Sequence, residues 1–331
     1  MANRKGKQRK AGSPRDEVLA ALPKACRDER AAVEFMEAQR WDESPNCPRC
    51  GDTEVSQMKA KDGTRNARFL WRCRGCKQQY TVRVGTIMED SAIPLRHWCY
   101  AFWAACASKK GVSAKQIERM TGLSYKSDLF LMHRIRFAMR ETPRAKLGGT
   151  VEFDETYVGG KPRKQAGQSR GWNGHAGMGP KPDFVDRKTP VVAGVERGGR
   201  VRARVTTDVT ARTLRAHVLD MVDSTARIMT DEAMGYRRLR DHFASHETVN
   251  HSENEFARGD VTTNTIEGFF SLLKRGVYGT FHNVSRKHLH RYLSEFEFRY
   301  NARKLSDGER TALAIRSADH KRLTHAQQVA G

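Results

Sequence analysis

The sequence predicts a mixed α/β domain in the second half of the chain, preceded by a zinc ribbon and a helical segment. Three features of the 331 residues lead to this fold class. Two Cys-x-x-Cys pairs lie in a basic stretch near the N-terminus, and apolar residues recur at helical spacing between residues 91 and 145. Beyond Gly149, short apolar runs alternate with an amphipathic helix, which is the pattern of a mixed sheet.

The composition predicts a protein that binds nucleic acid. The chain has 60 lysines and arginines against 38 aspartates and glutamates, so its formal charge is +22. A positive field of this size attracts polyanions, of which nucleic acid is the first candidate and an acidic membrane surface the second. The longest strongly apolar run, from Trp98 to Ala107, is half the length of a membrane span, and no charged-then-apolar leader precedes it. We therefore expect a cytoplasmic, nucleoid-associated protein without a membrane partner.

A basic arm and a short helical segment are expected before the ribbon. Residues 1–15 contain six basic and no acidic side chains together with glycine, serine and proline, a composition typical of a disordered arm. Such an arm either contacts DNA phosphate or is a solvated tail without a role. Residues 16–90 are expected to hold the helical segment and the ribbon, with Cys26 as a core thiol.

Four cysteines have the spacing of a structural zinc site. Cys47 and Cys50 form one pair, and after 22 intervening residues Cys73 and Cys76 form the other. A two-residue spacing lets one turn aim both sulfurs at a single ion, and four thiolates bind zinc without leaving an open coordination position. We therefore predict a zinc ribbon with structural Zn²⁺. The alternative is four unrelated buried cysteines.

Residues 91–145 are expected to form a helical, DNA-binding segment. After an apolar helix, Ser113 and Ser124 can each cap a further helix, and Thr121-Gly122-Leu123 can form the turn between them. This order is the plan of a helix-turn-helix, although an ordinary helical pair has the same pattern. The outer face of the second helix is expected to contact DNA through five basic side chains: Lys126, His133, Arg134, Arg136 and Arg140.

The segment 146–305 is expected to be the α/β domain, with a C-terminal tail at 306–331. Its expected strands are 151–154, 190–195, 201–206 and 226–230, and its expected helices are 210–223, 265–275 and 285–303. Between the first two strands, residues 160–188 are rich in glycine, lysine and arginine and are expected to form a long loop over the site.

Three acidic residues are candidates for a divalent-metal site. Asp154 lies within or at the end of one expected strand, Asp231 directly follows another, and Glu267 lies on an expected helix. Three carboxylates that meet at one point can bind a pair of Mg²⁺ ions, which act on the attacking and leaving oxygens of a phosphodiester displacement. The alternative for each residue alone is a solvated or ion-paired surface group.

The segments around these carboxylates resemble those of bacterial insertion-sequence transposases with an ISXO-type DDE integrase domain. The similar segments are VEFDETYVGGK at 151–161, TDE at 230–232 and NTIEGFFSLLKRG at 264–276. The resemblance continues through residues 279–282, 291–293 and 297–303, and includes the ribbon with residues 111–114 and 123–126. It covers roughly residues 25 to 305, and its motifs are specific in combination.

The resemblance implies an RNase H-like catalytic domain in which Asp154, Asp231 and Glu267 hold Mg²⁺ or Mn²⁺. Lys274 follows Glu267 after six residues, as a basic residue does in the wider DDE group, and is implied to hold DNA phosphate beside the metals. Seven residues are almost two helical turns, so the two side chains lie near one face of the helix.

Two neighbours of Glu267 and Lys274 are expected to add DNA contacts. These are Asn264, about one helical turn before Glu267, and Arg275. Some relatives of this branch use asparagine as the third metal residue, which leaves Asn264 as an alternative to Glu267. Glu267 is preferred because it carries charge and keeps the spacing to Lys274.

The resemblance implies a transposase that binds the terminal inverted repeats of its element, then cuts and rejoins DNA, and that is at least dimeric on DNA. Two rival functions stay open. A zinc-dependent DNA-binding regulator would explain the charge, the ribbon and the helical pair but not the acidic residues. A nuclease or resolvase on the same fold would cut DNA without joining it.

Overall fold

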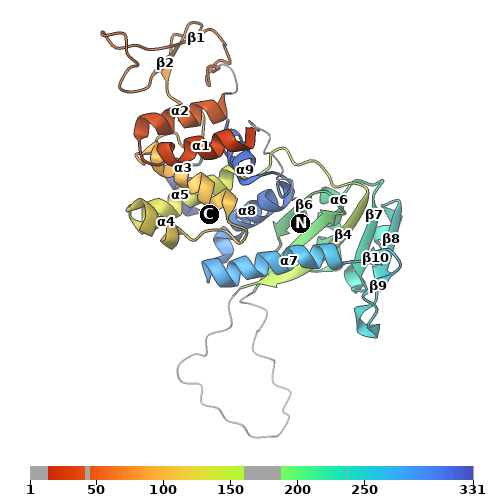
Figure 1. The fold of residues 1–331 in the computed structure, drawn as a ribbon. Helices are drawn as coiled ribbons and strands as arrows, with labels where there is room; N and C mark the ends of the chain where they lie inside the picture. The colour runs from red at the N-terminus through yellow and green to blue at the C-terminus, as the bar shows by residue number, and fades with distance from the viewer. Residues whose placement is uncertain (1–13, 42–44, 160–187, 237, 331) are drawn as a thin grey trace, which may run out of the picture. The chain divides into compact units, whose positions relative to one another are not determined.

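The computed structural model describes residues 14–41, 45–159, 188–236 and 238–330 (Figure 1). The chain forms two units. The helical unit comprises Met1–Glu141 and Ala302–Gly331, and the sheet unit comprises Thr142–Asn301. Most of the expected N-terminal arm and of the expected loop at 160–188 lies outside the described residues.

The sheet unit is built on five strands in the order β6-β5-β4-β7-β8. β4 pairs antiparallel with β5 and parallel with β7, so the sheet is mixed. The β5–β6 pair is antiparallel and the β7–β8 pair is parallel. The strands are β4 (Thr150–Val158), β5 (Thr189–Glu196), β6 (Val201–Val205), β7 (Arg227–Asp231) and β8 (Ser245–Val249). The four strands expected from the apolar runs are confirmed, and β8 is additional.

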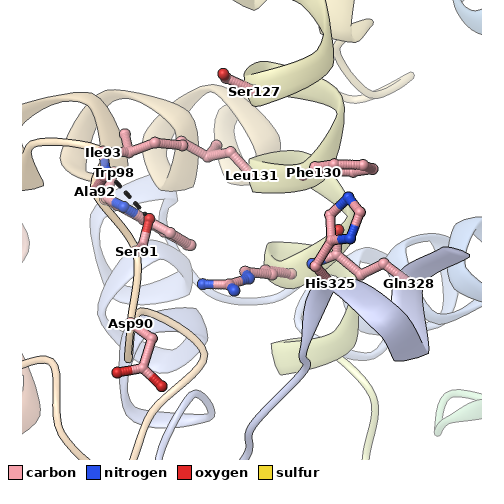
Figure 2. Close-up of a pocket in the computed structure, with 11 residues that line it drawn as sticks. Asp90, Ser91, Ala92, Ile93, Trp98, Ser127, Phe130, Leu131, His325 and Gln328 are labelled. Atoms are coloured by element: carbon pink, nitrogen blue, oxygen red, sulfur yellow. Dashed lines mark hydrogen bonds between the residues drawn. The ribbon is translucent and has the colours of Figure 1, made fainter.

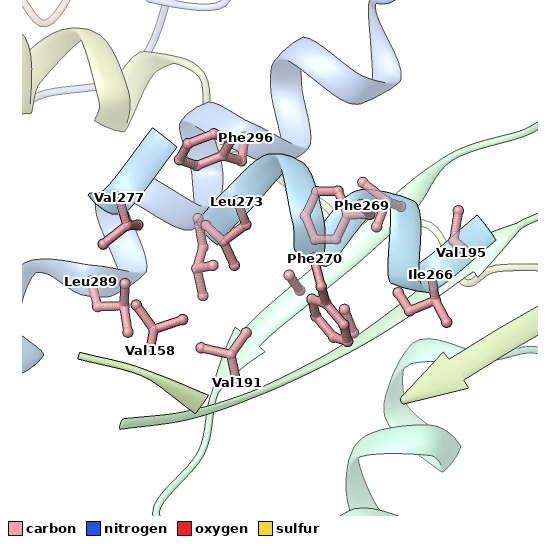
Figure 3. Packing of buried hydrophobic residues seen from close by; sticks show 14 residues of the cluster. Val158, Val191, Val195, Ile266, Phe269, Phe270, Leu273, Val277, Leu289 and Phe296 are labelled. Carbon is pink, nitrogen blue, oxygen red and sulfur yellow. The ribbon is translucent and has the colours of Figure 1, made fainter. Parts of the chain in front are cut away.

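Helices cover both faces of this sheet. On one face, α6 (Ala211–Met221) packs through Leu214 and Val218 in a cluster with Phe153 of β4. On the other face, α7 (Asn264–Gly276) and α8 (Leu289–Asn301) pack on alternate residues of β5. Figure 3 shows the α7 side chains of this second cluster above the strands. The expected mixed sheet flanked by helices is confirmed.

Shorter elements join these parts of the sheet unit. They are the 3₁₀ turns Met234–Tyr236, Leu239–Asp241, His251–Glu253 and Arg286–His288, the hairpin strands β9 (Ala257–Arg258) and β10 (Val261–Thr262), and the π-helical turn Val277–Phe281. The hairpin leads directly into α7, which begins two residues after β10.

The helical unit contains seven helices in the described ranges and a small sheet. The helices are α1 (Pro14–Ala25), α2 (Glu29–Arg40), α3 (Leu95–Ala107), α4 (Ala114–Thr121), α5 (Tyr125–Ala138), α9 (Asp307–Arg316) and α10 (His325–Ala330). The antiparallel sheet has the order β1-β2-β3, with β1 at Val55–Gln57, β2 at Trp71–Cys73 and β3 at Gln79–Tyr80. Within the described ranges, every helix is too short or too polar to cross a membrane.

The expectation of a C-terminal tail at 306–331 is wrong. This segment contains α9 and α10, and α9 packs against α1, α2 and α3. Ser306 caps α9 in a reciprocal arrangement with Glu309. Beyond α9, Asp319 accepts a hydrogen bond from Arg40 Nε at 2.6 Å. The last thirty residues therefore complete the helical unit, and the sheet unit is inserted between its two parts.

Candidate functional site

The four cysteines predicted to bind zinc lie together in the helical unit. Their Sγ atoms all lie within 4.8 Å of one another, with 3.6 Å between Cys47 and Cys76 and 3.6 Å between Cys50 and Cys73. Tetrahedral zinc with bonds of about 2.3 Å places sulfurs about 3.8 Å apart, so the four thiols fit this ion. Because all four ligands are sulfur, the site is structural rather than catalytic.

Local backbone and packing hold the two cysteine turns in place. Gly51 has φ +78°, the left-handed conformation that glycine adopts without strain. At Gly75 an added Cβ would lie 2.2 Å from a carboxylate oxygen of Asp52, so a larger residue in the second turn would require the Asp52 side chain to move. Trp71 of β2 donates from its indole to Glu37 of α2 at 2.8 Å, which fastens the ribbon to the neighbouring helix.

The two helices α4 and α5 begin at the predicted caps. The hydroxyl oxygens of Ser113 and Ser124 accept backbone hydrogen bonds at 3.2 Å from Gln116 and Ser127. Gly122 ends α4 in the left-handed conformation, so the short turn expected from the sequence is confirmed.

The predicted outer face of α5 needs correction. Arg136 is 1% exposed and His133 is 3% exposed, so both lie inside the helical unit. Arg134 donates to the backbone oxygens of Ile87 and Glu89 at 3.1 and 3.2 Å and thus holds a neighbouring segment. The physical reason is that α5 is surrounded by α3, α4, α9 and α10, which leaves little solvent-facing surface. Arg134 and Arg136 are therefore not retained as DNA contacts, whereas Lys126 is exposed.

A pocket of about 190 Å³ lies beside α5 in the helical unit (Figure 2). It is lined by the loop Asp90–Ile93, by Trp98 of α3, by residues of α5 and by His325 and Gln328 of α10. Arg134, which donates to the backbone oxygens of Ile87 and Glu89, is also one of its lining residues. The pocket holds none of the predicted catalytic carboxylates, which belong to the sheet unit.

Strand register brings the two predicted aspartates to the same level of the sheet. Parallel strands β4 and β7 pair Thr150 with Arg227 and Glu152 with Met229, an offset of 77 residues. Continued by two residues, the same offset places Asp154 level with Asp231. The ladder itself ends at the pair Glu152–Met229, so the strands are no longer bridged where the aspartates lie.

A buried carboxylate joins α7 to the same face of the sheet. Glu152 is fully buried and accepts hydrogen bonds from the backbone nitrogens of Thr265 and Ile266 at 2.7 and 3.0 Å. It also pairs with Arg197 Nε at 2.8 Å. The carboxylate thereby satisfies two free N–H groups at the start of α7. Because side chains alternate along a strand, Asp154 points to the same side as Glu152, toward α7.

Glu267 lies one turn into α7 and has two polar neighbours. The Thr263 hydroxyl donates to Glu267 Oε1 at 3.0 Å, and His251 Nε2 lies 3.8 Å from the same oxygen. His251 comes from the 3₁₀ turn after β8, and its backbone N–H donates to Glu232, the residue after Asp231. One short loop thus contacts both Glu232, the residue after β7, and Glu267 of α7.

Asp154 lies in a negatively charged environment. Its pKa is raised to about 7, chiefly by burial and in smaller part by the charges of Glu155, Asp231 and Glu267, while the hydrogen bond from the Glu155 backbone opposes the shift. Burial also raises the pKa of Asp231, while His251 opposes this shift. Among the described residues, the four cysteines are the one group of three or more His, Cys, Asp or Glu side chains close enough to hold a metal ion, so the structure does not bring the three carboxylates together in this way. The site concentrates negative charge that a divalent cation would neutralise, and carboxylate oxygens are ligands suited to Mg²⁺.

The predicted DNA-contacting residues of α7 lie on its solvent side. Asn264 and Arg275 are exposed, and Lys274 is half-buried. Arg275 Nε donates to the backbone oxygen of Ser271 within the helix. The apolar side of α7 is occupied by the cluster of Figure 3, so its polar side is the one available to a ligand.

Three residues that organise the site were not predicted from the sequence as functional. These are Glu152, which fastens α7 to β4, Tyr236, whose hydroxyl donates to Glu155, and His251. Glu152 and Glu155 could be seen only as acidic neighbours of Asp154. No periodicity or motif marks Tyr236 or His251, because both come from 3₁₀ turns whose position is set by tertiary contacts.

The raised pKa of Asp154 predicts that this residue destabilises the metal-free fold. Its folded-state pKa of about 7 exceeds the ordinary value of 3.8, so the folded state binds the proton more tightly, and stability falls as pH rises from about 4 to about 7. Asp154→Asn should raise the unfolding free energy of the Mg²⁺-free and Mn²⁺-free protein by about 2 to 4 kcal/mol at pH 8, and much less at pH 4.5. Urea unfolding at the two pH values measures this. An equal effect at both pH values would contradict it.

The fold and the two sites together define a zinc-ribbon protein with an acidic site on a mixed α/β domain. A profile of the ISXO2-like transposase domain matches residues 146–301, and one of the transposase zinc-ribbon domain matches residues 27–79. A curated relative from Halobacterium salinarum, described as an uncharacterized protein in transposable element ISH50, is 30% identical over 280 residues, covering 82% of this chain and 90% of the relative. The chain therefore belongs to the family of transposases with an ISXO2-like domain and a zinc ribbon. The relative is archaeal, so the family is not confined to bacteria.

Solved structures show only distant likeness. The Mos1 strand transfer complex is 14% identical, with 65% of this chain and 72% of that chain covered and a TM-score of 0.29. The Mos1 mariner paired end complex with Mn is also 14% identical, with 65% and 73% covered and a TM-score of 0.27. Similarity this weak informs neither the site nor its ligands.

Proposed function

We propose that this transposase binds the terminal inverted repeats of its element and catalyses metal-dependent DNA cleavage and strand transfer on an RNase H-like domain. Asp154, Asp231 and Glu267 are the catalytic carboxylates. One observation supports the proposal most: the register of the parallel strands β4 and β7 puts Asp154 and Asp231 at one level of the sheet, and the charges of Asp231 and Glu267 both act on Asp154.

The three carboxylates would hold Mg²⁺ or Mn²⁺. When bound, such ions stabilise negative charge on the attacking and leaving oxygens of a phosphodiester displacement. Water attacks the phosphorus at the element end, and the bond to the 3′ oxygen breaks. The freed 3′-hydroxyl then attacks a target phosphodiester, forming one P–O bond while another breaks. The protein keeps Glu267 oriented through the Thr263 hydroxyl and keeps α7 against β4 through Glu152.

Side chains of α7 would hold the DNA beside the carboxylates. Lys274 follows Glu267 by almost two turns, so its ammonium group can reach a phosphate next to the scissile one. Arg275 and Asn264 are exposed on the same helix. Glu267 is preferred to Asn264 as the third metal residue, because Glu267 carries a charge and keeps the spacing to Lys274.

The helical unit would supply most of the remaining DNA binding. The ribbon and the α4–α5 pair, acting as a helix-turn-helix, are its proposed DNA-binding parts, with Lys126 as an exposed contact. Joining two element ends to one target requires two sites, so we propose at least a dimer on DNA.

Cleavage of a plasmid carrying two element ends tests this function. With Mg²⁺ or Mn²⁺ the chain should cut at the end of the repeats and join the freed 3′ ends to target DNA. Specific end binding with no metal-dependent cleavage would instead identify a DNA-binding regulator. Cleavage without any joined product would identify a nuclease or resolvase.

The salt dependence of binding tests the phosphate contacts of α7. Removing one side chain that binds a phosphate should reduce the slope of log affinity against log salt by about one. We expect this reduction for Arg275→Ala and little change for Arg212→Ala, an exposed arginine on α6 that removes the same charge. Fluorescence anisotropy between about 50 and 200 mM salt measures the slopes. Equal slopes for the two variants would show that only net charge matters.

A further inference from the structure

Phe256 is the most exposed large hydrophobic side chain in the described part of the chain. Its exposed fraction is 59%, and it lies between the 3₁₀ turn His251–Glu253 and strand β9. A phenyl ring left in water forgoes the stabilisation that burial would give. The ring therefore presents an aromatic face to solvent.

The ring lies one side chain away from Glu267, one of the three proposed catalytic carboxylates. The ring centroids of Phe256 and His251 are 5.5 Å apart, and His251 Nε2 is 3.8 Å from Glu267 Oε1. The hairpin β9–β10, which follows Phe256, leads into the end of α7 that carries Glu267 (Figure 1). An exposed aromatic surface is thus continuous, through His251, with the acidic site.

The loop that carries Phe256 is held by hydrogen bonds to Glu232, the residue after Asp231. Glu232 accepts the backbone N–H groups of His251 and Ser252 at 2.9 and 3.0 Å. The Glu255 N–H donates back to the Asn250 carbonyl at 3.0 Å, which closes the loop just before Phe256. These bonds present the ring in a defined place, which lowers the entropy cost of binding a ligand.

The surroundings of Phe256 fit a single flat ligand better than an apolar protein surface. The residues on both sides of it in the chain, 252–254 and 257–258, are exposed, and they include Glu253 and Arg258. Protein interfaces usually combine several apolar side chains in one patch. One isolated aromatic ring beside a phosphodiester site, in a chain of charge +22, matches the face of a nucleobase.

We propose that Phe256, backed by His251, is a stacking site for one nucleobase next to the phosphodiester held at the catalytic carboxylates. When a base next to the cleavage point leaves its stack, an aromatic face can take the place of the neighbouring base. Phe256 would thereby position the strand rather than take part in the chemical step. This inference rests on the proposed function, because it assumes that element-end DNA occupies the site.

The stacking site is tested by measuring DNA affinity for protein variants and DNA variants in combination. Anisotropy titrations at one salt concentration compare an intact duplex of the element end with six modified duplexes. Each modified duplex carries a single abasic nucleotide, at one of three positions on either side of the cleavage point. Phe256→Ala should weaken binding of the intact duplex at least about fivefold. At one abasic position this loss should disappear. Phe256→Trp should bind like the native chain, and Leu219→Ala, which shortens an exposed apolar side chain on α6, should change nothing.

Other outcomes separate the possible failures. If Phe256→Ala weakens every duplex equally, or none, the stacking site is overturned whether or not the chain joins DNA. If native chain and variant bind every duplex equally but differ in oligomeric state, Phe256 contacts a second copy and the proposal is also wrong. If the affinities change as expected but no joining occurs, the stacking site stands and the proposed strand transfer fails. If the chain binds no element-end duplex, the proposed function itself fails and the stacking site fails with it.

Discussion

Asp154→Asn and Asp231→Asn should each lower metal-dependent strand cleavage at least about 10³-fold while leaving binding of element-end DNA nearly unchanged. The amide keeps the volume of the side chain and an oxygen that can accept the same backbone hydrogen bond. Asp154 accepts this bond from the N–H of Glu155 at 2.7 Å, and Asp231 accepts it from the N–H of Ala233 at 3.1 Å. It removes the negative charge that would bind the cation. Single-turnover cleavage and anisotropy on the same duplex measure the two quantities.

A nearby acidic residue provides the matched control. Glu253 is exposed in the loop that also carries His251, and Glu253→Gln removes the same charge. Its cleavage rate should stay within about twofold of the native rate. If either aspartate variant cleaves normally, that residue does not belong to the catalytic set.

Replacing Cys73 and Cys76 together by serine should release zinc and unfold the ribbon. Both sulfurs lie 3.6 Å from a partner of the other pair, so the double change removes half of the ligands. Zinc content by native mass spectrometry should fall from about one ion per chain to nearly none, because two hydroxyl groups cannot replace thiolates. Binding of element-end DNA should weaken at least about tenfold, since the ribbon is a proposed DNA-binding part.

Cys26 supplies the control for the zinc measurement. It is a half-buried thiol after α1 that lies outside the cluster, and burial raises its pKa, so it stays a thiol at neutral pH. Cys26→Ser should keep its zinc and its DNA binding. Unchanged zinc content in the Cys73/Cys76 variant would disprove the zinc assignment.

Local signals in the sequence predicted most elements of the fold. Ser113 and Ser124 are capping residues followed by helical periodicity, and both helices begin where these caps predict. The apolar run of β5 likewise has the continuous hydrophobicity of a central strand, and β7 is marked by its apolar pair Ile228 and Met229. β8 was missed because its residues 245–249 are largely polar, as suits a strand at the edge of the sheet.

The C-terminal helices could have been found from the same kind of signal. Ser306 and Glu309 form a capping box, a pattern readable three residues apart in the sequence. The packing of the C-terminal helices in the helical unit could not be predicted from a local pattern, because it depends on long-range contacts such as that of Arg40 with Asp319. The buried position of Arg136 is also a tertiary effect, since nothing local distinguishes it from an exposed helical arginine.

The acidic residues of the site could be predicted, but not how they are held. The position of Asp231 at the end of β7 follows from the apolar run that precedes it, whereas Asp154 lies in the middle of β4, which continues to Val158. Their common level depends on the β4–β7 register, which no local pattern encodes. The role of Glu152 as a buried anchor for α7 requires knowing which face of β4 the helix covers.

Joining of a pre-cut, labelled element end to plasmid DNA tests the central claim most directly. The reaction is run with Mg²⁺ or Mn²⁺ and compares the native chain with Glu267→Gln, a side chain that keeps an oxygen for the Thr263 hydroxyl and loses only its charge. We expect joined product with the native chain and a decrease of at least about 10³-fold with the variant. Joining at the native rate by Glu267→Gln would show that the carboxylates of β4, β7 and α7 do not form the catalytic site.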